Sequence, residues 1–104
     1  MKHIIAICLS LFCLSASAAS LAQQADSAYN REAYADAIRL YQESITTDGV
    51  SSNILYNLGN AYYRDNQLGK AILSYERALT LDPSNKEAAT NLNFVKTRIE
   101  DAPE

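Results

Sequence analysis

Apolar residues in the second half of the chain recur with the spacing of two amphipathic helices. Four of them fall at positions i, i+3, i+4 and i+7, which form one face of an α-helix: Leu55, Leu58, Gly59 and Tyr62. A second stripe of the same period follows: Leu68, Ala71, Ile72, Tyr75, Ala78 and Leu79. The polar segment 64–67 between the stripes is short, so the two helices are predicted to be antiparallel neighbours.

The same pattern occurs one unit earlier in the chain. When the sequence is aligned with itself so that Ala37 matches Ala71, an earlier set of residues matches the second stripe and the aspartate that follows it. The set is Tyr34, Ala37, Ile38, Tyr41, Ile45 and Asp48. The first helix of this earlier unit is degenerate, because Ala25 stands in the place of Gly59 and Ala28 in the place of Tyr62. A degenerate terminal unit is typical of a capping repeat, one side of which faces solvent.

A single helix is predicted to close the array. Ser84 and Glu87 have the S-x-x-E spacing of a capping box, which predicts a helix start after Pro83. The apolar stripe of this helix is Ala88, Leu92, Val95 and Ile99. Strand-like alternation is absent, so the chain is predicted to be all-α, with about two helix-turn-helix repeats and a C-terminal capping helix at 85–100.

Segment 52–85 resembles a tetratricopeptide repeat. The family pattern W-x2-L-G-x2-Y, A-x3-F and P is matched by Leu55-x2-Leu58-Gly59-x2-Tyr62, Ala71-x3-Tyr75, Ala78 and Pro83, with Leu55 in the Trp position and Tyr75 in the Phe position. The resemblance implies a right-handed superhelical α-α array in a domain at 19–104, with repeat 1 at about 18–51 and repeat 2 at 52–85. It also implies a binding scaffold. An unrelated helical hairpin protein is the alternative.

Residues 1–18 are predicted to be a secretory signal peptide. Lys2 supplies the basic start, an apolar run covers 4–14, and small residues at 16–18 suit cleavage. The run is shorter than the roughly 20 residues that span a bilayer, so no membrane insertion is expected after cleavage. The protein is therefore expected in the periplasm or cell envelope. A retained anchor and a lipoprotein modified at Cys13 are the alternatives.

The remaining composition argues against catalysis. The one histidine and both cysteines, His3, Cys8 and Cys13, lie in the predicted signal peptide. Without them the chain lacks the commonest general base, a thiolate and the usual transition-metal ligands, so we expect neither an enzyme nor a cofactor. Removal of Lys2 changes the net charge from −3 to −4. No basic cluster is present, which argues against nucleic acid as a partner.

The resemblance places a partner on the concave side of the array, which the first helix of each pair lines. The polar and aromatic residues expected there are Tyr29, Asn53, Tyr56, Asn57, Asn60, Tyr63, Arg64, Asn91, Phe94 and Arg98. Tyrosine and arginine dominate the binding energy of many interfaces, and amides bond an extended backbone. Packing of Tyr56 and Tyr63 between adjacent repeats is the alternative interpretation.

A narrower resemblance covers most of 19–104. Segments 56–63, 69–79 and 91–94 look like the tetratricopeptide part of BatE-type aerotolerance proteins of Bacteroidetes, which resemble envelope scaffolds encoded beside von Willebrand-type membrane proteins. The expected function is an exported scaffold that holds a peptide or helix of an envelope protein in its concave groove. The alternative is a self-assembly module that forms a homodimer through its open helix faces.

The export hypothesis predicts a mature N-terminus near Ala19, because the basic, apolar and small-residue regions follow one another in the order of a signal peptide. N-terminal sequencing of protein recovered from the periplasm measures this directly. A chain that begins at Met1, or at a lipid-modified Cys13, would contradict the prediction.

Overall fold

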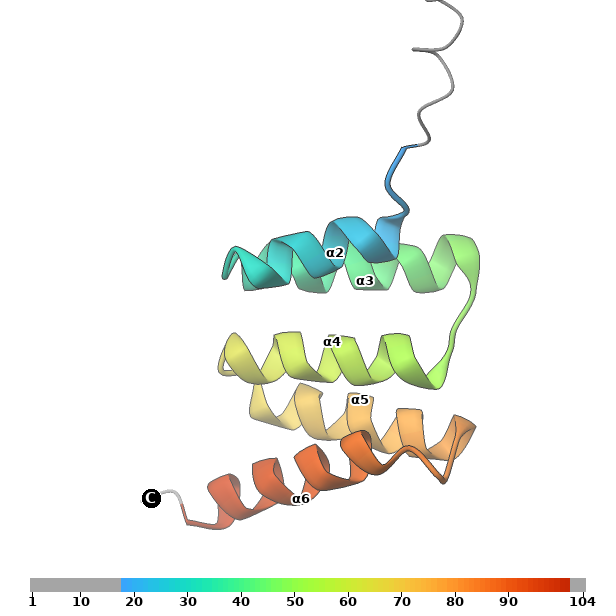
Figure 1. Cartoon of the computed structure of the whole chain (residues 1–104). Helices are drawn as coiled ribbons and strands as arrows, with labels where there is room; N and C mark the ends of the chain where they lie inside the picture. Colours follow the sequence, from blue (N-terminus) through green and yellow to red (C-terminus); the bar gives the residue numbers. More distant parts are fainter. Residues whose placement is uncertain (1–17, 102–104) are drawn as a thin grey trace, which may run out of the picture.

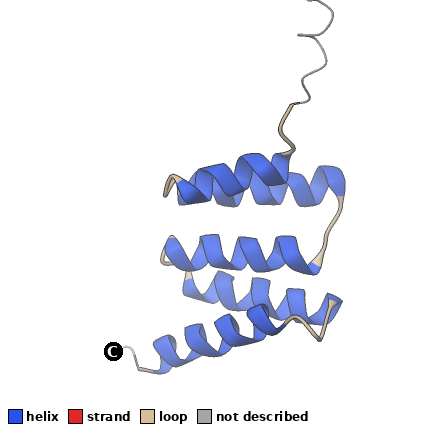
Figure 2. Cartoon of the chain, in the orientation of Figure 1, coloured by secondary structure: helices blue, strands red, loops and turns tan. Residues whose placement is uncertain are grey.

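The computed structural model describes residues 18–101, so the predicted signal peptide lies outside the described residues except for Ala18. Within this range the chain forms five α-helices: α2 (Leu21–Asn30), α3 (Tyr34–Asp48), α4 (Ser52–Arg64), α5 (Leu68–Leu81) and α6 (Lys86–Glu100). Figure 2 shows helices joined by short loops and, in the part of the chain that is described, no strand. The prediction of an all-α array of paired helices is confirmed.

The helices are stacked in chain order (Figure 1). The two most extensive helix contacts join α4 to α5 and α2 to α3, which are the two antiparallel pairs. The next join α5 to α6 and α3 to α4, while α4 and α6 touch only slightly. The single helix α6 therefore occupies the place that the first helix of a third pair would take.

The turns within the two pairs have the same structure. Glu32 and Asn66 occupy equivalent positions and both adopt left-handed backbone conformations, with φ of 63° and 61°. The amide of Ala33 donates to the carbonyl of Ala28 at 2.9 Å, and the amide of Gln67 donates to that of Tyr62 at 2.8 Å. These bonds form the Schellman motif that ends many helices. The polar segment 64–67 thus reverses the chain as predicted.

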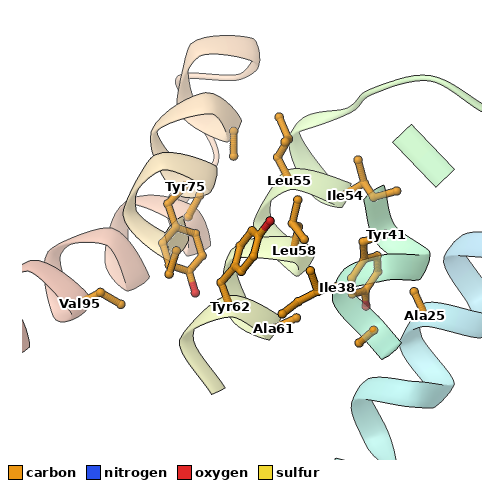
Figure 3. Packing of buried hydrophobic residues seen from close by; sticks show 14 of the residues in the cluster. Ala25, Ile38, Tyr41, Ile54, Leu55, Leu58, Ala61, Tyr62, Tyr75 and Val95 are labelled. Carbon is orange, nitrogen blue, oxygen red and sulfur yellow. The ribbon is translucent and has the colours of Figure 1, made fainter. Parts of the chain in front are cut away.

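The core is one continuous cluster that runs through all five helices (Figure 3). Its buried members are Ala25, Ala28, Ala37, Ile38, Tyr41, Ile54, Leu55, Leu58, Ala61, Tyr62, Ala71, Tyr75, Ala78, Ala88, Leu92 and Val95. Both predicted stripes of the middle pair contribute to it. In the closing helix, the predicted core residue Ile99 is 42% exposed, because α6 there extends beyond the helices it packs against.

Gly59 lies where the Tyr75 ring of α5 packs against the backbone of α4. A Cβ atom at this position would lie 2.6 Å from Cε1 and 2.7 Å from Cδ1 of the buried Tyr75 ring. No real Cβ tolerates such distances, and the ring is held in the core and has no room to move. The glycine costs about 1 kcal/mol of helix propensity relative to alanine, and in return the aromatic ring packs directly on the α4 backbone.

The start of α6 differs from the prediction. Ser84 does not cap the helix, because its hydroxyl and amide both donate to Asp82 Oδ1, at 2.6 and 3.0 Å. The capping residue is Asn85, whose side chain accepts from the Ala88 amide at 3.1 Å. The cap predicted from the S-x-x-E spacing is wrong because a turn around Pro83 directs the Ser84 side chain to Asp82. The capping box of this chain lies instead at Ser20 and Gln23, before α2.

Asn85 also ties three helices together. Its amide donates to the Ser52 hydroxyl at 2.8 Å, and that hydroxyl donates to the carbonyl of Ala78 at 2.7 Å. The relay joins the start of α6 to the first residue of α4 and the last turn of α5. Because Asn85 is buried, loss of either bond would leave a polar group unpaired away from water.

We expect Gly59→Leu to unfold the domain and Gly69→Ala to be mild. The leucine would overlap the Tyr75 ring, and overpacking of this kind costs about 3 kcal/mol or more, whereas a Cβ at Gly69 meets nothing within 4 Å. Thermal melts followed by circular dichroism measure both. If Gly59→Leu melted within about one degree of the wild type, the close contact would be wrong.

Asn85→Ala should destabilise the protein by about 1–2 kcal/mol, because it removes both the cap and the bond to Ser52. Ser84→Ala is the matched control, and its exposed bonds to Asp82 are expected to contribute less than about 0.5 kcal/mol. Urea unfolding of the two variants gives the comparison. An equal loss of stability in the two variants, or a larger loss in Ser84→Ala, would favour Ser84 as the capping residue, as the sequence predicted.

Candidate partner-binding groove

The predicted concave side carries a cavity of about 330 Å³. We call it the front groove, and it is lined by Tyr29, Tyr56, Asn60, Tyr63, Arg64, Tyr75, Asn91, Phe94 and Val95. These residues come from α2, α4 and α6, which are the first helices of successive units, with Tyr75 of α5 between them. Successive first helices therefore form one continuous surface.

The front groove contains seven of the ten residues that the sequence predicted: Tyr29, Tyr56, Asn60, Tyr63, Arg64, Asn91 and Phe94. Arg98 lies beside the front groove and lines a smaller adjoining cavity. Its Nη1 donates to the Tyr63 hydroxyl at 2.7 Å. The structure does not bring Asn53 or Asn57 into either cavity. Asn53 lies in the first turn of α4, before the groove, and Asn57 lies about 100° around the helix from Tyr56.

Two asparagines form the polar centre of the front groove. Asn60 Oδ1 accepts from the Tyr75 hydroxyl at 2.5 Å and from Asn91 Nδ2 at 2.9 Å. The same Asn91 amide group approaches the Tyr56 hydroxyl at 3.5 Å. These bonds link α4, α5 and α6 through side chains. They also fix the orientation of both amides, which a ligand would otherwise have to order at a cost in entropy.

The outward-facing halves of these amides are available to a ligand. Among residues 18–101, Asn60 Nδ2 and Asn91 Oδ1 make no hydrogen bond, and no buried side-chain nitrogen or oxygen there lacks a partner. Both atoms therefore contact solvent. One is a donor and the other an acceptor, and an extended backbone presents the matching acceptor and donor. The front groove thus presents a donor and an acceptor in fixed orientations.

Burial keeps the Tyr75 hydroxyl protonated. Desolvation raises the pKa of Tyr75 well above the ordinary tyrosine value, while the nearby Asn91 amide acts in the opposite direction. The pKa of Tyr41, the equivalent tyrosine of the first unit, is raised in the same way by burial and by its hydrogen bond to Asp26. A tyrosine hydroxyl is already protonated at neutral pH, and the raised pKa extends its role as donor to Asn60 to alkaline pH.

Aromatic rings form the walls of the front groove. Tyr63 and Phe94 meet edge to face with ring centroids 5.7 Å apart, and Tyr56 tilts against Tyr75 at 6.1 Å. Phe94 is 53% exposed, although its neighbour Val95 is buried. Tyr56 and Tyr63 are half-buried, so each packs against a neighbouring helix and still lines the cavity. The two tyrosines therefore pack as the alternative interpretation expects, while their role in binding stays a prediction.

Two arginines lie at the edge of the groove. Arg64 stacks over Tyr34 at 5.1 Å and forms an exposed ion pair with Glu32 at 3.9 Å. Arg98, its counterpart on α6, stacks over Tyr63 at 5.6 Å and forms no ion pair within residues 18–101. A guanidinium that is stacked but not paired is ready to bind a carboxylate. The groove therefore combines aromatic walls, oriented amides and one available cation.

Sequence reasoning missed two lining residues, Tyr75 and Val95, which were assigned to the core. Both are buried, and only their edges reach the cavity, so the periodicity gives no signal of this contact. Other chemistry is sparse in the described range. No group of three or more metal-ligating side chains is assembled within 18–101, and no helix there has the length and apolarity of a membrane span.

Comparison with known proteins supports the repeat assignment. Residues 52–85, which contain α4, α5 and the turn to α6, match the family model of the tetratricopeptide repeat. A protein described as "Protein CTR9 homolog", from Arabidopsis thaliana, is 29% identical over 84 residues. The alignment covers 80% of this chain but 8% of that protein, so the chain spans only a small part of the length of its relative.

The tetratricopeptide repeat is a non-catalytic unit of protein-binding scaffolds, and each copy packs only against its neighbours. The pair formed by α4 and α5 has this structure, with Gly59 and Tyr75 at the contact. The chain therefore contains a tetratricopeptide repeat, within an all-α array of packed helix pairs that suits protein–protein interaction.

Proposed function

We propose that this chain is an exported scaffold whose front groove holds an extended peptide segment of an envelope protein. The observation that carries the proposal is the pair of amides at Asn60 and Asn91, which internal hydrogen bonds orient toward the cavity. A surface that only packs against the next helix would need no outward donor and acceptor. Main-chain hydrogen bonds to such a pair give affinity, and aromatic walls select side chains.

The chemistry of the groove favours a particular kind of segment. Phe94 and Tyr63 offer apolar surface, so an apolar or aromatic side chain of the partner would pack there. Arg98 favours a carboxylate at the same end of the groove. The net charge of −3 over the whole sequence opposes a strongly acidic partner. The proposed ligand is therefore an extended, largely apolar segment with one acidic group.

Two features of the sequence support a location in the cell envelope. The order of basic, apolar and small residues over 1–18 is that of a secretory signal peptide. Segments 56–63 and 91–94, which supply most of the groove, resemble the BatE-type aerotolerance proteins. On this basis we place the scaffold in an aerotolerance-type complex, where its partner would be a segment of a membrane protein exposed in the periplasm.

A second candidate function is self-assembly through the open end of the array. In the described part of the chain α6 has no second helix packed beyond it, and the exposed apolar residues Leu81, Phe94 and Ile99 lie on or beside it. Two copies that stacked these surfaces would form a homodimer. Light scattering over a range of concentrations separates the two functions, because a monomer at every concentration removes the second.

The double variant Tyr63→Ala with Phe94→Ala tests the front groove. We expect partner binding to weaken at least about tenfold, or about 1.4 kcal/mol, because the two rings form one wall of the cavity. The rings are partly solvent-exposed, so the helical spectrum should stay intact. The partner is first captured from the envelope fraction with the wild-type protein, and its affinity for each variant is then measured by calorimetry.

The matched control is Glu43→Ala with Asn93→Ala, two exposed residues that lie outside the front groove. It should bind as the wild type does. Asn60→Ala is a poor test, because it would also unpair the Tyr75 hydroxyl and the Asn91 amide and so destabilise the fold. The proposal fails if the captured partner binds the ring variant normally but loses affinity for the control.

A further inference from the structure

A second and larger cavity, of about 590 Å³, lies on a different face of α4. We call it the back groove. Its walls are α3 and α5, and its floor is formed by Leu55, Leu58 and Tyr62 of α4. The front groove uses Tyr56, Asn60 and Tyr63 of the same helix, so adjacent residues line different cavities. The volume is within the range of about 300–1,000 Å³ that is typical of ligand pockets.

The lining of the back groove is mainly apolar. Leu55, Leu58 and Tyr62 are buried except for their outer edges, while Val50 and Leu73 at the rim are 52% and 49% exposed. Exposed aliphatic side chains on both sides of a concave apolar floor form a contiguous patch, and such patches mark interaction sites more often than isolated apolar residues do.

Several polar atoms of the floor and walls are used inside the protein. The Ser74 hydroxyl donates to the carbonyl of Leu55 at 2.7 Å, and the Gln42 amide donates to the Tyr62 hydroxyl at 2.7 Å. The Thr46 hydroxyl donates to the Gln42 carbonyl at 3.1 Å. Among its neutral groups, the Gln42 amide oxygen and the Tyr62 hydroxyl hydrogen make no hydrogen bond within residues 18–101, so few such groups remain for a peptide backbone. An occupant that satisfies its own backbone hydrogen bonds, as an α-helix does, is therefore favoured over an extended strand.

Among the residues that the structure describes, two charged side chains line the back groove, and both are cations, Lys70 and Arg77. Neither forms an ion pair within residues 18–101, and Lys70 Nζ lies 5.9 Å from the centroid of the Tyr62 ring. Together with Leu73 they form one stripe along α5. The local charge is thus opposite to the net charge of −3 of the whole sequence. An occupant with carboxylates at the rim would complement it.

We propose that the back groove binds an amphipathic helix of a partner protein that carries two carboxylates two turns apart. Lys70 and Arg77 are seven residues apart on α5, which corresponds to about 10.5 Å along the helix axis. Two acidic residues at i and i+7 of a docked helix have the same separation. The apolar face of that helix covers Leu73, Val50 and the floor, as in other helix-in-groove complexes. This site is independent of the front groove and of the proposed export.

Fluorescence anisotropy with two designed peptides tests the proposal. Both are labelled amphipathic helices with leucines on one face, and they carry either two glutamates at i and i+7 or two lysines at the same positions. The wild-type protein is expected to bind the glutamate peptide at least about tenfold more tightly than the lysine peptide. Lys70→Glu with Arg77→Glu should reverse that preference, because both cations become carboxylates.

The matched control is Arg31→Glu with Lys86→Glu, which makes the same change in net charge at exposed residues outside the back groove. It should keep the preference for the glutamate peptide, with at most a small general loss. Leu73→Gln should lower the affinity for the glutamate peptide at least about fivefold, because it removes apolar surface from the groove. The circular dichroism spectrum should not change, because Leu73 is half exposed.

Three results would overturn the proposal. The first is equal affinity of the wild type for both peptides. The second is an equal loss of preference for the glutamate peptide in the control and in the variant Lys70→Glu with Arg77→Glu. The third is a wild type that binds anionic phosphatidylserine vesicles but not the glutamate peptide, together with loss of vesicle binding in the variant Lys70→Glu with Arg77→Glu. The front-groove variant Tyr63→Ala with Phe94→Ala should bind the glutamate peptide normally. This result separates failure here from failure of the proposed function.

Discussion

The contact between Gly59 and Tyr75 determines much of the rest of the structure. The missing side chain at Gly59 lets the Tyr75 ring pack on the backbone of α4, and the ring then brings its hydroxyl to Asn60. Asn60 in turn accepts from Asn91 of α6. One steric constraint in the core thereby orients the polar groups of the front groove. The shape of the front groove is a consequence of helix packing.

A second constraint keeps the last helix in place. Within residues 18–101 no helix packs beyond α6, and its far end is exposed at Ile99. The buried Asn85 compensates at the near end, where its bonds join α6 to α4 and α5 through Ser52. Buried polar groups specify geometry because the alternative is an unpaired donor. The relay anchors the start of the helix that carries Asn91 and Phe94.

Much of the fold followed from periodicity, because helix packing repeats from one unit to the next and the sequence repeats with it. Tyr41 and Tyr75, and Glu32 and Asn66, have equivalent structural roles in the two units. Local chemistry was harder to predict. Ser84 has the spacing of a cap, but the turn around Pro83 directs its hydroxyl to Asp82, and only the three-dimensional path of the chain reveals this.

The predicted site illustrates the same limit. Helical spacing identifies the face of α4 on which Tyr56, Asn60 and Tyr63 lie, but not how far a cavity extends along it, which is why Asn53 falls outside. It also gave no sign of the back groove. The periodicity predicts three core residues on this face, Leu55, Leu58 and Tyr62. They are buried, but the space between α3 and α5 leaves their edges uncovered. A cavity between helices depends on the sizes of side chains from three elements at once.

The use of two faces of α4 bears on how the two proposed sites would work together. Tyr62 and Tyr63 are neighbours in sequence and line opposite grooves, and the adjacent residues Ser74 and Tyr75 do the same on α5. Occupation of one groove would influence the other only if α4 and α5 had a second arrangement to adopt, because coupling between sites requires two states with different affinities. The tight contact at Gly59 opposes any sliding of these helices. On the two proposals, the grooves would act as a rigid bridge that holds two partners at a fixed spacing, rather than as a switch between them.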